Sequence, residues 1–264
     1  MRTIIKLLFL STIILTACKN KEEKAATKDA TKSTSPFVES VEKAHNKKAF
    51  LSKNYIQFDI DIEFGGKPRL AGTLTMNTNS SEIRIDKKDG TTLFYDGKNV
   101  LLSPASTDEK GARFDMFTWA YFFALPYKLN DPGAQIEQLK DHELDSIPFD
   151  TAKLTFAKNT GDAPDDWYVL YADKNTGLME AAGYIVTFGK SLEKAEANPH
   201  AIAYHKYEKE QNIPIATQWT FHNWTQQTGL GDTIGKGTLS NIKFVHKTSN
   251  FFKAPEDSKP ITMD

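Results

Sequence analysis

The sequence predicts a mainly β (α+β) domain, in which one antiparallel sheet of about eleven strands packs around a buried helical plug. Segments that alternate between apolar and polar residues recur along most of the 264-residue chain. Short turns join these segments, and such connections require antiparallel neighbours. One aromatic segment, at 114–125, is too apolar for a surface strand and has the composition of a buried helix.

The N-terminus has the order of a secretory signal: basic residues, then an apolar stretch, then small residues before a cleavage point. Arg2 and Lys6 precede the apolar run 7–14, which is too short to span a bilayer comfortably. Residues 15–18 (LTAC) follow and resemble the bacterial lipobox. That resemblance implies lipidation of the Cys18 thiol. The alternative is an ordinary secretory signal with a cysteine there by chance.

Cys18 is the only cysteine, so neither an internal disulfide nor a cysteine-rich zinc site can form. Lipidation implies removal of the signal peptide 1–17 and attachment to the bacterial outer membrane, on its periplasmic face or at the cell surface. Several acyl chains on one residue anchor a protein stably. Residues 18–35 hold no large apolar side chain beyond the cysteine, which predicts a solvated tether to a single domain at 36–264.

The charge balance argues against a nucleic-acid partner. The chain has 33 basic and 34 acidic residues, whereas a nucleic-acid-binding domain normally carries a basic excess. The signal and the tether hold more basic than acidic residues, so the remaining domain is net acidic. Such a domain gains little electrostatic attraction from an anionic membrane surface. We therefore expect the lipid alone to attach the protein to the membrane. We also expect a monomer.

The domain begins with a predicted helix. Ser35 is a suitable N-cap, and Pro36 suits the first helical position. Apolar residues then recur at helical spacing and form one face through about Lys48. They are Phe37, Val38, Val41 and Ala44.

The pattern then changes to strict alternation, which predicts a hairpin of half-buried strands at 55–64 and 69–77. One face of the first strand carries Asp59, Asp61 and Glu63 and is expected to be exposed. The opposite, apolar face of the hairpin is the candidate cavity wall. Its candidate residues are Phe58, Ile60, Leu74 and Met76.

Further strands are predicted at 82–86, 93–95, 100–102, 152–157, 167–172, 178–188, 201–208, 215–223 and 237–245. Between them lies the aromatic helix at 114–125, which Pro126 ends. Its side chains have two interpretations, core packing or the lining of a cavity or lid. The candidates for the second role are Phe114, Phe117, Trp119, Tyr121 and Phe122.

The order of these elements behind a lipobox resembles the LolA/LolB-like superfamily of outer-membrane lipoprotein-sorting proteins. The matching pieces are 95–98 (YDGK) leading into 100–102 (VLL), and 167–171 (WYVLY) followed by the turn 173–178. Residues 119–129 (WAYFFALPYKL) resemble more closely a lipoprotein family catalogued as a domain of unknown function, DUF6503.

The resemblance implies a curved half-open barrel with helices plugging its concave face and an apolar cavity between them. Relatives of that shape carry acyl chains of lipoproteins or lipids. In the better-known carriers an arginine helps to hold the helical lid. Arg69, Arg84 and Arg113 match no such motif, and a stable anchor suits a membrane-fixed role better than a soluble shuttle. We therefore expect a membrane-anchored envelope lipoprotein that binds an acyl chain, lipid or other apolar ligand.

Catalytic and metal motifs are absent from the sequence, so we expect no enzyme, no cofactor and no metal. The six histidines form no His-Glu-x-x-His pattern, and no Gly-x-Ser-x-Gly elbow occurs. The glycines at 229–231 and 235–237 lack the helix that a phosphate loop needs and predict a hairpin loop. Two alternatives remain: an envelope interaction or structural lipoprotein with a filled core, and a hydrolase, if His205 or His222 meets a nucleophile.

Overall fold

The computed structural model describes residues 35–108, 110–144 and 146–262. Residues Thr34–Asp264 form one compact unit. The predicted signal peptide, Cys18 and the tether up to residue 34 lie outside the described residues.

The described part of this unit is built on one antiparallel 14-stranded sheet. The sheet order is β14-β5-β4-β3-β2-β1-β13-β12-β11-β10-β9-β8-β6, and β7 pairs with β8 beside this path. The strands are β1 (Tyr55–Phe64), β2 (Lys67–Asn77), β3 (Ile83–Lys87), β4 (Thr92–Tyr95), β5 (Val100–Ser103), β6 (Ala134–Gln138), β7 (His142–Leu144), β8 (Ile147–Phe156), β9 (Tyr168–Asp173), β10 (Met179–Tyr184), β11 (His200–Glu210), β12 (Ile213–Thr225), β13 (Gly229–Val245) and β14 (Lys259–Ile261).

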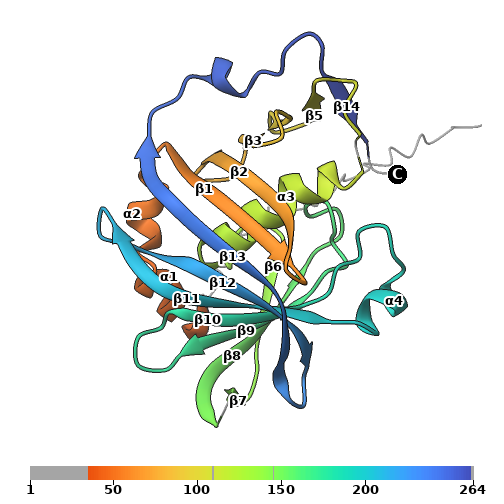
Figure 1. Cartoon of the computed structure of the whole chain (residues 1–264). Coiled ribbons are helices and arrows are strands. Elements are labelled where there is room, and N and C mark those ends of the chain that lie inside the picture. Colours follow the sequence, from red (N-terminus) through yellow and green to blue (C-terminus); the bar gives the residue numbers. More distant parts are fainter. Residues whose placement is uncertain (1–34, 109, 145, 263–264) are drawn as a thin grey trace, which may run out of the picture. The chain divides into compact units, whose positions relative to one another are not determined.

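The predicted fold class is confirmed, with a somewhat higher strand count. The three strands that the sequence pattern did not predict are β6, β7 and β14, which are short. β1 pairs with both β2 and β13, so the sequence-distant halves of the sheet meet at this strand. Helix α3 (Ala112–Ala124) lies between β5 and β6 in the chain, and the sheet curves around it (Figure 1).

The main core lies between α3 and the concave face of the sheet. Apolar residues of β1 alternate inward, and Phe58 stacks on Phe123 of α3 with ring centroids 4.5 Å apart. The inward residues Ile60, Leu74 and Met76 are at most 2% exposed. This packing follows from the alternation, because a strand with one apolar face must bury it against another layer.

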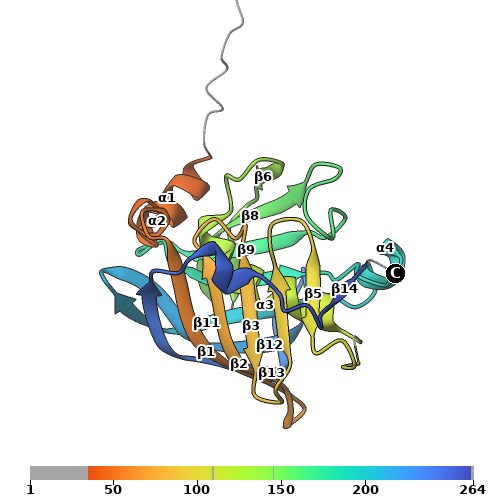
Figure 2. The same cartoon turned by 90° about the horizontal axis from the view of Figure 1, so that it is seen from above.

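The first predicted helix is divided into α1 (Pro36–Ala44) and α2 (Lys47–Leu51). Asn46 between them has a left-handed backbone with φ of 52°, which ends α1 before the predicted Lys48. Ser35 occupies the N-cap position, but its hydroxyl makes no cap hydrogen bond. Figure 2 shows α1 and α2 together at one end of the domain, away from the short helix α4 (Leu192–Glu196). The 3-10 turns are η1 (Leu125–Tyr127) and η2 (Ser249–Phe252).

The glycines of 229–237 do not form a hairpin loop, because β13 runs through them. A Cβ at Gly235 would lie 2.5 Å from the Phe64 ring, and one at Gly237 would lie 2.8 Å from Ile62. These glycines therefore let the Phe64 and Ile62 side chains of β1 approach the backbone of β13 closely. This close approach explains why a glycine-rich segment, which resembles a loop in the sequence, forms part of a strand.

Candidate functional site

A cavity of about 500 Å³ lies beside α3 at one end of the concave face. Its volume is within the range of ordinary ligand pockets. Residues from α3, from the six strands β3, β4, β6, β8, β9 and β10, and from the loops after β2, β4, η1, β8 and β10 form its wall. The apolar and aromatic members include Ile83, Tyr95, Phe114, Phe117, Phe122, Phe156, Val186 and Phe188.

Four of the five candidates on the aromatic helix line this cavity: Phe114, Phe117, Tyr121 and Phe122. They share a face because residues three and four apart are neighbours on a helix. Thr118 lies among them and also lines the cavity. The fifth candidate, Trp119, points elsewhere and is 2% exposed.

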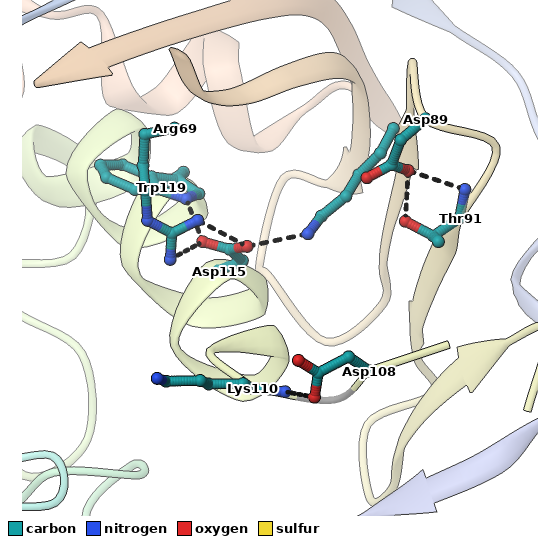
Figure 3. A network of polar contacts seen from close by, with 8 residues as sticks. Arg69, Asp89, Thr91, Asp108, Lys110, Asp115 and Trp119 are labelled. Carbon is teal, nitrogen blue, oxygen red and sulfur yellow. Dashed lines mark hydrogen bonds and ion pairs between the residues drawn. The ribbon is translucent and has the colours of Figure 1, made fainter. Parts of the chain in front are cut away.

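Trp119 belongs to a polar cluster that fixes α3 to the sheet (Figure 3). Its indole Nε1 donates to Asp115 Oδ1 at 3.0 Å, one helical turn away. Asp115 is 1% exposed and also forms ion pairs with Arg69 at 2.8 Å and Lys87 at 2.9 Å. Arg69 comes from β2 and Lys87 from β3, so a single buried carboxylate joins the helix to two strands.

The four strand candidates lie in the core and do not line the cavity. Phe58, Ile60, Leu74 and Met76 are covered because α3 packs directly on the centre of the sheet. The strand residues that line the cavity come from farther along the sheet instead. They are Ile83, Tyr95, Ala134, Phe156, Tyr168 and Tyr184.

Ion pairs tie the wall of the cavity together. Arg113, in the first turn of α3, donates from Nε to Asp162 Oδ2 at 2.6 Å and from Nη1 to the carbonyl of Ile261 at 3.0 Å. Lys128 pairs with Asp131 at 2.9 Å. The two Arg113 contacts hold the β8–β9 loop and β14 against the helix. The wall is therefore built from segments far apart in the sequence.

Three tyrosines give the cavity wall a polar component. Tyr121, Tyr168 and Tyr184 line the cavity, and within the described ranges their hydroxyls have no hydrogen-bond partner. Burial raises the pKa of all three above the ordinary tyrosine value, so the hydroxyls stay neutral. The cavity therefore combines apolar rings with neutral hydrogen-bonding groups, as ligand pockets commonly do.

His205 and His222 meet at one hydroxyl on the opposite face of the sheet. The Nε2 atoms of His205 and His222 lie 2.7 and 2.8 Å from Thr220 Oγ1. Since His222 Nδ1 donates to the carbonyl of Gly231 at 2.9 Å, a neutral His222 accepts the Thr220 proton at Nε2. A hydroxyl beside its base is the first requirement of a nucleophile, but none of the three side chains lines the cavity described above.

Within the described ranges, no group of three or more His, Cys, Asp or Glu side chains could hold a metal ion. In the same part of the chain, no helix combines the length and the apolar character needed to cross a bilayer.

No protein-family model and no curated protein sequence matches this chain. A LolA superfamily protein from Nitrosomonas europaea has a similar solved structure, with a TM-score of 0.54 and 7% identity over 81% of this chain and 97% of that one. A DUF1329 family protein from Desulfovibrio piger is similar with a TM-score of 0.50 and 14% identity, over 83% of this chain and 98% of the other. These similarities show a LolA-like fold, while the resemblance of 119–129 to DUF6503 stays a prediction.

Proposed function

We propose that this chain is a membrane-anchored envelope lipoprotein whose half-open barrel binds an acyl chain, a lipid or another apolar ligand. The observation that carries the proposal is the cavity of about 500 Å³, lined by aromatic side chains of α3 and of the sheet. Burial of an acyl chain contributes about 0.8 kcal/mol per methylene group. A handful of buried methylenes thus provides useful affinity, which supports a ligand-binding role.

The proposed role is binding rather than catalysis. Aromatic rings line the cavity, and four of its six charged side chains form ion pairs with each other. The two histidines that share Thr220 lie on the other face of the sheet. An interaction lipoprotein without a ligand is the second candidate, favoured by the dense packing of Phe58 and Phe123 in the centre of the barrel. We propose that the protein is a monomer.

The direct test is extraction of the purified unit Thr34–Asp264 with organic solvent, followed by mass spectrometry. We expect a lipid or fatty acid at close to one molecule per chain when the protein is expressed in a bacterial host. Protein denatured before purification and then refolded provides the lipid-free control. Extracts of the native protein that match this control would contradict ligand binding.

The proposed anchor is tested at Cys18. We expect cells that express Cys18→Ala to lose incorporation of radioactive palmitate into the protein, because the chain has no other cysteine. The variant should also move from the outer-membrane fraction to soluble fractions, or accumulate unprocessed. Undiminished label in the variant would contradict the proposed location. Cys18→Ser is the matched control for side-chain size, and its label should be lost as well.

A further inference from the structure

Asp166 stands out among the charged residues of the cavity because it is half-buried and forms no ion pair with any described residue. Six charged side chains line the cavity, and four of them form the pairs Arg113–Asp162 and Lys128–Asp131. Lys98 and Asp166 are left without an ion pair among the described residues. Lys98 is on an exposed turn, whereas Asp166 is half-buried beside the start of β9.

Only one carboxylate oxygen of Asp166 is occupied. The backbone N–H and the hydroxyl of Thr187 both donate to Oδ1, each at 2.7 Å. In the part of the chain that the structure describes, Oδ2 accepts no hydrogen bond. Thr187 thus fixes the orientation of the carboxylate and leaves Oδ2 open.

The surroundings disfavour the charged form of this carboxylate. Burial raises the pKa of Asp166, the two Thr187 hydrogen bonds lower it, and the negative charge of the neighbouring Asp165 raises it further. The negative charge of Asp166 in turn contributes to the raised pKa of Tyr121 and Tyr168. A desolvated carboxylate without a cation is costly, and an arriving cationic group would relieve that cost.

We propose that the ligand of this cavity is an apolar chain ending in an ammonium group that binds Asp166 Oδ2. Tyr121 and Tyr168 line the same cavity, and their hydroxyls, which have no partner among the described residues, are available to polar atoms next to the nitrogen. The apolar chain lies along the aromatic face of α3. This inference rests on the proposed function, because it requires that the cavity hold an apolar ligand.

The test compares three probes of equal chain length: dodecylammonium, dodecanol and dodecanoate. Each displaces the neutral dye Nile red from Thr34–Asp264, below micellar concentrations and at about pH 8, where an alkylammonium keeps its proton. We expect dodecylammonium to bind about tenfold more tightly than dodecanoate, as expected for one added charge pair in a partly desolvated site.

Asp166→Asn removes the charge and keeps an oxygen that can accept both Thr187 hydrogen bonds. We expect the affinity ratio of dodecylammonium to dodecanoate to fall to less than about threefold in this variant, and the affinity for dodecanol to stay unchanged. Asp165→Asn is the matched control, since it removes an exposed charge one residue away and should keep most of the preference.

Different results would contradict the ammonium assignment alone or together with ligand binding. Equal binding of the three probes to the wild type, or an unchanged preference in Asp166→Asn, would overturn the ammonium assignment while ligand binding stands. Failure of all three probes and of Nile red to bind would overturn the assignment together with the proposed function.

Discussion

Replacing Asp115 by alanine is expected to lower the free energy of unfolding by about 3 kcal/mol. The substitution leaves Arg69, Lys87 and the indole N–H of Trp119 without their shared acceptor, and Trp119 is almost fully buried. Breaking a buried ion pair from one side costs roughly 3–5 kcal/mol. The lower end applies here because the Arg69 side chain keeps 36% exposure and can turn to water.

Urea unfolding of Thr34–Asp264, followed by tryptophan fluorescence and far-UV circular dichroism, measures this loss. Asp61→Ala is the matched control, because Asp61 forms only an exposed pair with Lys88 at 3.6 Å. Its cost should stay below about 1 kcal/mol. An Asp115→Ala protein within that same margin of the wild type would show that the buried carboxylate does not secure α3 to the sheet.

Filling the cavity is expected to weaken ligand binding at least about tenfold, which corresponds to the lost burial of about two methylene groups. Thr118 is suited to this substitution, because it lines the cavity among the aromatic residues of α3 and is only half-buried. The ring of Thr118→Trp would occupy space that an apolar chain needs. Titration with Nile red, or with the dodecyl probes, measures the change.

Thr118→Val is the matched control, since it keeps the side-chain volume and should bind as the wild type does or slightly better. Thermal unfolding of both variants separates a filled cavity from a damaged fold. Unchanged affinity in a well-folded Thr118→Trp protein would mean that the probes bind elsewhere.

The alternation of apolar and polar residues predicts most of the sheet. The sequence predicts a strand at 55–64, and β1 lies at Tyr55–Phe64, because strict alternation from Ile56 onward has only one way to bury its apolar face. β7 and β14 have three residues each, too few to show a period. The glycines of β13 resemble a loop in the sequence, and only their close contacts with neighbouring strands explain them.

The cavity is harder to predict from the sequence than the sheet. The composition of the aromatic segment predicts a helix, but the inward and outward faces of that helix are both apolar, so periodicity does not separate Trp119 from Phe122. Asp115 carried a usable signal, a carboxylate one turn before a tryptophan in an otherwise apolar helix. The sequence contains no such signal for Asp166, because its place in the cavity depends on a loop and on Thr187, which is 21 residues away in the chain.

A crystal structure of Thr34–Asp264, purified without denaturation and grown with a long-chain amphiphile, tests ligand binding in the cavity most directly. We expect continuous density for an apolar chain along Phe114, Phe117 and Phe122, with its polar end near Tyr121 and Asp166. A cavity closed by its own side chains, or filled only by ordered water in the presence of saturating amphiphile, would contradict the proposed function.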